Sequence, residues 1–403
     1  MAERYLPLSL TVFRVDRPTP VDVWSDQGLL LLAHGHRVAS PEQLRRLVAH
    51  RPMVKQSDYL VLQAQGLAGA LLRPGVSVTA GALTAPPARA AARARGDWAE
   101  PALAWPRLHT RLAACWHDPL PKAPAPPFAE RLLELAGHLA DLADEHPDDS
   151  LFMLLQMLAD PTLGYSATHA WLVALICHLT AAEAGVSAAE RQSLCAAALT
   201  MNVGMSRLHD ALARQKSALS PVQRAEILAH PQAGAQCLAE WGVADSLWLQ
   251  LVREHHESPD GQGYPGGLTR LGTAQRLLHL ADLYVARISP RANRSGLSPL
   301  TAVRNLYLEH PDDHLLPELL ARHLGLYPPG SYVRLRSGET AVVVRRGRRA
   351  NEPVVLAIVN AQGWPIAVPA TRDTRQPAHA VHASVLAEEV RVRLDPVKIL
   401  QRT

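Results

Sequence analysis

The sequence has few of the features that mark nucleic-acid-binding, disulfide-stabilised or membrane proteins. Only three of its 403 residues are phenylalanine, and the Lys and Arg residues form no run interleaved with aromatics, so a surface that stacks bases is not expected. The four cysteines show no CxxC spacing, which indicates free apolar thiols of a reducing compartment. No window reaches the roughly 18 consecutive apolar residues of a membrane span, and the start, MAERYLPLSLTVF, lacks a secretory pattern. We therefore expect a cytoplasmic protein that has neither a nucleic-acid polymer nor a membrane as partner.

The overall composition is that of a globular protein with more than one domain. Hydrophobic residues make up 48% of the chain and charged residues 19%, and the formal net charge is +4. These values are ordinary for soluble proteins. A chain of 403 residues is long enough for two or three domains, at least one of them with a full hydrophobic core.

The first segment, residues 1–64, is expected to be a small β or α/β module. LSLTVF alternates apolar and polar residues, and the apolar stretches VDVW and LLLLAHG flank the turn SDQG, as in a β-hairpin. Ser40 is a suitable N-cap for a short helix over residues 41–49. No ligand motif is visible in this module, so we expect it to serve packing or dimerisation.

The second segment, residues 65–127, is expected to be a linker. Ala, Pro and Arg dominate its composition, and it ends in the proline-rich stretch PLPKAPAPP. The Trp and Leu residues between the prolines can alternatively pack on a neighbouring element.

The remaining chain is expected to be a helical bundle over residues 128–325 followed by a small β element over residues 326–403. Apolar residues recur at helical spacing from residue 128 onward, whereas YPPGSYVRLRSGETAVVV and EPVVLAIVN are β-branched and alternating. The fold class is therefore mainly α, with a small β-containing module on each side. Helices are predicted over residues 128–142, 151–158, 166–184, 188–199, 221–239, 244–256, 273–288 and 299–308.

Four histidines and one aspartate in this bundle are candidate metal ligands. Each lies on a predicted helix or at its end, so a bundle can direct them all inward. Imidazole and carboxylate groups together suit first-row transition metals. The alternative is that they are ordinary surface or core residues, since the chain has 19 histidines. The candidates are His169, His230, His255, His256 and Asp282.

The order and spacing of these residues resemble the HD-GYP family of phosphohydrolases, which cleave the bacterial messenger cyclic di-GMP. The stretch HHESPDGQGYP carries the most specific part of the resemblance, and ILAHPQAG and HLADLYVA match its neighbours over residues 165–294. The resemblance implies an HD-type helical bundle. It also implies that the glycine-rich loop shapes the rim of a pocket or presents its tyrosine to a partner such as a GGDEF-type cyclase domain. The loop residues are Asp260, Gly261, Gly263, Tyr264 and Pro265.

The resemblance further implies a two-metal site and a phosphate clamp. In the family, the positions of His169 and Asp282 hold one metal, and those of the other three histidines hold a second. Arg291 and Arg294, in SPRANR, match an Arg-x-x-Arg pair that contacts phosphate. A solvated helix end would contain the same two arginines, so this assignment stays open.

The sequence departs from the family where the family carries its His-Asp pair and a following lysine. Here the stretch reads TMNVGM, with Met201, Asn202 and Met205 at those three positions. A neutral asparagine bridges metals poorly, a thioether is a soft ligand, and the lysine that helps to neutralise the phosphate is lost. We therefore expect at most one weakly held divalent metal, Fe or Mn, on the histidines. Tyr165 stands where some family members place a ligand for a third metal, so a third metal is not expected.

A literal His-Asp pair occurs nearby at His209 and Asp210. It follows a polar, arginine-bearing stretch instead of ending a buried helix, and Asp210 matches the family's Ile-Pro-Asp loop. We therefore do not expect this pair to replace the missing one.

Three functions remain open from the sequence. The first is a degenerate signalling protein that binds cyclic di-GMP or partner proteins without efficient turnover, which the three replacements favour. The second is an active metal-dependent cyclic di-GMP phosphodiesterase that uses the residual ligands. The third is a structural scaffold with relic histidines. A GGDEF-type or other signalling protein and a second copy of the chain are the candidate partners.

Overall fold

The computed structural model describes residues 5–7, 19–24, 30–37, 53–55, 58, 100–121, 125–310 and 313–402. The chain divides into two compact units. One comprises residues 1–94 with 304–314, and the other comprises residues 95–303 with 315–403. Among the described residues, no helix combines the length and the hydropathy that a membrane span requires.

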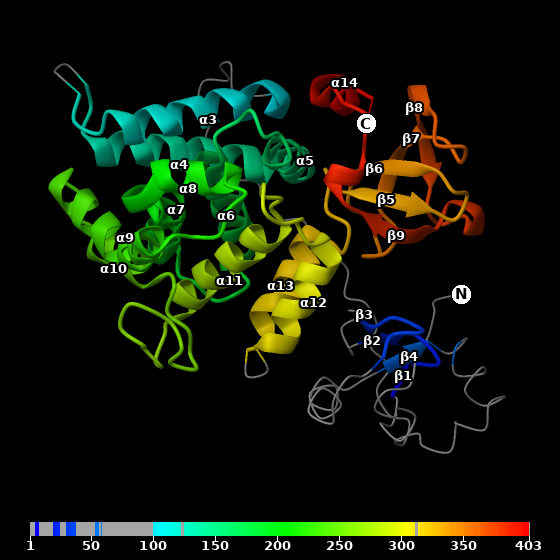
Figure 1. Ribbon diagram of the computed structural model, residues 1–403, viewed down its shortest axis with the longest axis horizontal. Coiled ribbons are helices and arrows are strands. Elements are labelled where there is room, and N and C mark those ends of the chain that lie inside the picture. Colours follow the sequence, from blue (N-terminus) through cyan, green and yellow to red (C-terminus); the bar gives the residue numbers. More distant parts are fainter. Residues whose placement is uncertain are drawn as a thin grey trace. The chain divides into compact units, whose positions relative to one another are not determined.

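The first unit contains a four-stranded antiparallel sheet (Figure 1). Its strands stand in the order β1-β4-β2-β3. The pairing of β2 with β3 confirms the expected hairpin. The LSLTVF stretch beyond Pro7 and the expected helix over residues 41–49 lie outside the described residues. The strands are β1 (Tyr5–Pro7), β2 (Val23–Trp24), β3 (Leu30–Leu32) and β4 (Met53–Lys55).

The second unit is built around a helix that is buried on every side. α6 (Tyr165–Ala181) is rich in apolar residues and has no polar face, as expected of a central helix. The sequence also sets several helix starts, since Ser187 and Ser220 each form a capping box with the residue three positions later. The other helices described before the C-terminal sheet are α3 (Pro101–His117), α4 (Phe128–Glu145), α5 (Pro147–Leu158), α7 (Ala188–Thr200), η2 (Val203–Met205), α8 (Ser206–Arg214), α9 (Pro221–Glu240), α10 (Ser246–Glu254), α11 (Thr273–Ile288), α12 (Pro299–Glu309), whose residues from 304 onward belong to the first unit, and α13 (Leu315–Leu324).

Helix α3 differs from the expectation of a linker over residues 65–127. Trp105, Leu108 and Leu112 recur at helical spacing and are fully buried. The Trp105 ring packs edge-on against Trp171 of the central helix, with ring centroids 5.5 Å apart. Apolar periodicity therefore outweighs the Ala/Pro/Arg composition here. Residues 65–99 and 122–124 lie outside the described part of the chain.

A five-stranded antiparallel sheet follows the helices and confirms the expected C-terminal β element. The strands stand in the order β8-β7-β6-β5-β9 and enclose a small core that includes Val333, Val343 and Val355. The sheet meets α5, where Gln156 Nε2 donates to the backbone oxygen of Gly330 (2.7 Å) and Tyr332 Oη donates to Gln156 Oε1 (3.1 Å). The elements are β5 (Tyr332–Leu335), β6 (Thr340–Arg345), β7 (Val354–Val359), β8 (Pro365–Asp373), η3 (Pro377–His379), β9 (Val381–Val385), η4 (Ala387–Glu389) and α14 (Pro396–Leu400).

Candidate metal centre

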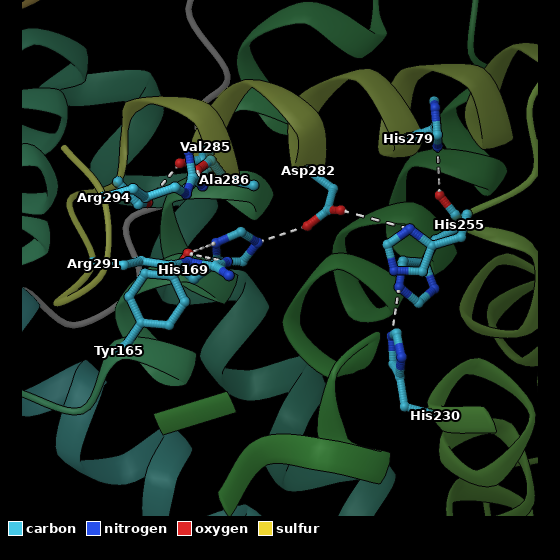
Figure 2. Close-up of polar contacts among 12 residues, drawn as sticks. Tyr165, His169, His230, His255, His279, Asp282, Val285, Ala286, Arg291 and Arg294 are labelled. Atoms are coloured by element: carbon cyan, nitrogen blue, oxygen red, sulfur yellow. Dashed lines mark hydrogen bonds and ion pairs between the residues drawn. The ribbon is translucent and has the colours of Figure 1, made fainter. Parts of the chain in front are cut away.

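Four helices bring the five predicted ligands together in the interior of the helical bundle. Asp282 of α11 lies between His169 of α6 on one side and the histidines of α9 and α10 on the other (Figure 2). His255 is the C-cap residue of α10, and His256 follows it. His169, His230 and His255 are each at most 1% exposed, and Asp282 is 6% exposed. Buried polar groups in such numbers need partners inside the site.

The strongest indication of a metal is the way in which two of the histidines face each other. His230 Nε2 lies 3.1 Å from His255 Nε2. Their Nδ1 atoms lie 2.5 Å from the oxygen of Ile227 and 2.7 Å from the oxygen of Val252. A carbonyl only accepts, so each Nδ1 carries the proton and each neutral ring turns its Nε2 lone pair toward the other. Two lone pairs at this distance repel unless a proton or a cation lies between them.

His256 completes a three-histidine group, which we call the histidine cluster (His230, His255 and His256). Its ligand atoms all lie within 4.8 Å of one another, and no other such group occurs among the described residues. Asp282 Oδ2 lies 4.0 Å from His256 Nδ1 and adds a carboxylate at the edge of the cluster. Three imidazoles and one carboxylate are a donor set that suits a first-row divalent metal.

The surroundings of these groups keep them in the protonation states that bind metal. Burial lowers the pKa of His230 and of His255, and it lowers the pKa of His256 to about 4. Burial acts on Asp282 in the opposite direction, but the hydrogen bond and charge of His169, followed by the charges of the other histidines, outweigh it and hold the pKa of this carboxyl below its ordinary value. Neutral imidazoles and a charged carboxylate therefore prevail at neutral pH.

His169 lies outside the histidine cluster and takes part in a chain of hydrogen bonds that ends at Asp282. Arg291 Nη2 donates to Tyr165 Oη (3.2 Å), and Tyr165 Oη lies 3.3 Å from His169 Nδ1. His169 Nε2 lies 2.7 Å from Asp282 Oδ1. The consistent assignment is that each group donates to the next, with the carboxylate as final acceptor. In this arrangement His169 orients the carboxylate.

The two predicted phosphate-contacting arginines have different surroundings. Arg291 is half-buried beside Tyr165, with its guanidinium 5.3 Å from the centre of that ring. Arg294 is exposed, and its Nη2 donates to the backbone oxygen of Ala286 (2.6 Å) at the end of α11. Only Arg291 is connected to the candidate ligands by a described contact.

The glycine-rich loop is held against the histidine cluster by a buried acid that the sequence reasoning did not single out. Glu257 is 1% exposed, and its carboxylate accepts from the backbone nitrogens of Gly266 (2.5 Å) and Leu268 (2.8 Å). The ring of Tyr264 stacks on His256, with centroids 4.6 Å apart. The Glu in HHESPDG is the signal that identifies this anchor, because a buried acid next to the buried His255 must have donors of its own.

The backbone path of the loop depends on its other predicted residues. A Cβ on Gly263 would lie 2.6 Å from the oxygen of His256, and Gly261 has a φ of +73°. Asp260 Oδ1 accepts from the nitrogen of Gln262 (2.9 Å), and Pro265 is exposed. The tyrosine therefore faces the cluster, while the tip of the loop faces solvent.

The segment at the position of the family's His-Asp pair packs directly on α9, the helix that carries His230. Met201 and Asn202 are buried at the end of α7. A Cβ on Gly204 would lie 2.6 Å from the oxygen of His230, so this segment touches α9 closely. Met205 is half-buried. The replaced side chains are thus part of the same buried region as the candidate ligands.

The two residues of the nearby literal His-Asp pair have separate surroundings. Asp210 Oδ1 accepts from the backbone nitrogen of Ser166 (2.7 Å) and thereby caps the start of α6. His209 is 5% exposed and turns toward the site, with its ring 4.7 Å from that of Tyr165 and 5.4 Å from that of His169. The pair does not act as a unit, and its histidine belongs to the site.

The chain is similar in sequence to known proteins. A sequence model of the HD domain matches residues 150–319. The chain is 26% identical over 239 residues to a cyclic di-GMP phosphodiesterase of Pseudomonas aeruginosa, covering 56% of each protein. It is 26% identical over 166 residues to the 3'3'-cGAMP-specific phosphodiesterase 3 of Vibrio cholerae, covering 41% of this chain and 36% of that one. The chain thus spans about half or less of the length of these curated relatives. A solved structure of an HDG"Y"P protein from Bdellovibrio bacteriovorus has a TM-score of 0.43 and 17% identity, covering 79% of this chain and 98% of that one.

Proposed function

We propose that this chain, which matches the HD domain over residues 150–319, is a signalling protein of the HD-GYP family that binds a cyclic dinucleotide and one divalent metal without efficient hydrolysis. The dinucleotide is cyclic di-GMP, the substrate of its Pseudomonas aeruginosa relative. The observation that carries the proposal is the facing pair of Nε2 atoms in the histidine cluster, 3.1 Å apart.

The histidine cluster and Asp282 hold the metal, which is Fe or Mn. When bound, such a metal polarises a phosphate and lowers the pKa of bound water. Backbone carbonyls orient two of the ligands, since Ile227 and Val252 fix the rings of His230 and His255. His169 does not bind the metal itself in this proposal but orients Asp282 by a hydrogen bond to its carboxylate.

Hydrolysis is impaired because the metal position of His169 and Asp282 lacks the further ligands that the His-Asp pair supplies in the family. Met201 and Asn202 at the end of α7 carry no charge. Asp282 is therefore the one predicted ligand whose negative charge offsets the charge of a metal. Met205 removes the cation that would neutralise the phosphate. Each of these losses acts on charge stabilisation, which commonly dominates phosphoryl transfer.

Metal analysis combined with nucleotide binding and turnover tests the proposal. We expect purified protein to contain about one Fe or Mn per chain and to bind cyclic di-GMP in calorimetry, with little product formed in excess Mn²⁺ or Fe²⁺. His255→Ala should lose the metal, because it removes one of the two facing nitrogens. His178→Ala is the matched control, since His178 lies toward the far end of α6 and contacts Asp144 on the surface.

Two outcomes would contradict the proposal. Rapid hydrolysis of cyclic di-GMP, abolished by His255→Ala, would show that the protein is an active phosphodiesterase. The complete histidine cluster is the observation that favours this alternative. Absence of both metal and nucleotide binding would leave a scaffold with relic histidines.

The glycine-rich loop is the surface that we assign to a protein partner. Residues 265–270 are exposed, while Tyr264 is stacked on His256. A partner of the GGDEF type that binds the loop would therefore contact a segment anchored to a metal ligand. A second copy of the chain is the alternative partner, and sedimentation with and without a GGDEF-type domain separates the two.

A further inference from the structure

His209 is a buried imidazole without a hydrogen-bond partner for one of its nitrogens. The residue is 5% exposed, and its Nδ1 has no partner among the described residues. A buried polar atom left unpaired destabilises the fold. Its position beside the rings of Tyr165 and His169 indicates that it serves a ligand.

A second unpaired nitrogen lies beside the same tyrosine. Arg291 Nε is buried and has no partner in the described part of the chain, while Nη2 of the same side chain donates to Tyr165 Oη. A guanidinium nitrogen only donates, so the missing partner must be an acceptor. The positive charge of Arg291 disfavours a metal ion here and favours an anion.

The sequence position of His209 fits the same conclusion. It lies four residues after Met205, which stands where the family has a phosphate-neutralising lysine, and three residues before the buried Leu212. Residues three apart share one face of a helix, so His209 lies on the buried face of α8 that Leu212 also occupies. Met205 is the N-cap residue that precedes this helix.

We propose that His209 is a phosphate-contacting residue, which together with Arg291 takes the role of the missing lysine. A neutral imidazole offers one N–H to a phosphate oxygen, and Arg291 Nε–H offers another. This inference rests on the proposed function only in taking that phosphate to be part of a cyclic dinucleotide. No bond is made or broken in this contact.

Binding measurements on the metal-loaded full-length chain test the inference. His209→Phe keeps an aromatic ring against Tyr165 and removes both nitrogens. We expect this variant to bind cyclic di-GMP at least about tenfold more weakly than the native protein while retaining its metal. His178→Phe, the control, should bind both as the native protein does.

Histidine-selective NMR provides a readout that a merely structural role would not change. The His209 signal, assigned by its loss in His209→Phe, should shift when inorganic phosphate or cyclic di-GMP is added. Tight cyclic di-GMP binding by His209→Phe, with an unmoved His209 signal in the native protein, overturns this inference alone. Loss of metal in His209→Phe makes the residue a metal ligand and also overturns it. If the native protein binds neither probe, both this inference and the proposed function fail.

Discussion

Gly263 lies where the glycine-rich loop passes closest to the backbone of the residues that it covers. A Cβ at this position would lie 2.6 Å from the oxygen of His256, whereas at Gly164 the nearest atoms are 3.7 Å away. We expect Gly263→Ala to destabilise the protein by about 1–3 kcal/mol, because backbone atoms must shift. Metal affinity should fall as well, since His256 moves with the loop. Thermal denaturation and metal titration measure the two effects.

Gly164→Ala is the matched control for this substitution. Its added methyl group makes only ordinary contacts with Asp210 and His109. Equal melting temperatures for the two variants would contradict the described path of the loop.

The Glu339–Arg372 pair predicts a defined pH dependence in the C-terminal sheet. Hydrogen bonds from Arg372 hold the pKa of Glu339 below its ordinary value of 4.5. The charged carboxylate therefore contributes its full stabilisation above about this value, and the contribution is lost as the pH falls through the lowered folded-state pKa. Glu339→Gln should lower the melting temperature at pH 7, and its loss of stability between pH 5 and 3 should be smaller than that of the native protein.

Melting curves at several pH values measure this difference. Glu130→Gln, an exposed residue of α4, is the control and should follow the native curve. A Glu339→Gln curve parallel to the native one would show that the carboxylate contributes no pH-dependent stability.

At the scale of the elements, the end of α7 is the segment to which we assign the missing metal ligands. Met201→His combined with Asn202→Asp would place an imidazole and a carboxylate where the family has them. We expect the bound metal to rise from about one to about two per chain and turnover of cyclic di-GMP to rise at least about 100-fold. Elemental analysis and product chromatography measure the two changes. The single substitution Met205→Lys, which restores only the cation, should leave metal content unchanged.

An unchanged metal content in the double variant, with its fold intact, would contradict the assignment of TMNVGM to the missing pair. Higher metal content without turnover would locate the loss of activity elsewhere in the site.

Several elements were predictable because their signals are local. The apolar period marked most helices from α4 onward, though not α8 or α13, and the hairpin and C-terminal strands followed from alternation and turns. Helix α3 was not predicted, since its prolines and alanines concealed the spacing of Trp105, Leu108 and Leu112. The comparisons confirm the HD-GYP resemblance, which rested on HHESPDGQGYP.

The candidate site was predictable only in part, because several contacts depend on packing between distant segments. The convergence of His230, His255 and His256 followed from the family pattern. The burial of His209 against Tyr165, and the separate role of Asp210 as a cap, depend on how α8 packs on α6. The metal-ligand roles remain predictions.

At the scale of the whole second unit, Gln156 connects the helical bundle to the C-terminal sheet. Its side chain donates to Gly330 and accepts from Tyr332. Gln156→Ala leaves the buried oxygen of Gly330 without that donor, so we expect a loss of about 1–3 kcal/mol in the free energy of unfolding. Urea denaturation followed by tryptophan fluorescence measures it. Gln250→Ala, in which an exposed contact with Glu254 is removed, should have little effect.

In the proposed function, the chain of hydrogen bonds from Arg291 through Tyr165 and His169 to Asp282 connects the residues assigned to the phosphate with those assigned to the metal. Thermodynamic reciprocity requires that any factor by which a bound anion changes metal affinity equals the factor by which the metal changes anion affinity. The concentration of free metal would then set the messenger level at which the domain is half-occupied. With the function that we propose, the protein would report the coincidence of two chemical signals, iron or manganese supply and cyclic dinucleotide, with little turnover of the dinucleotide.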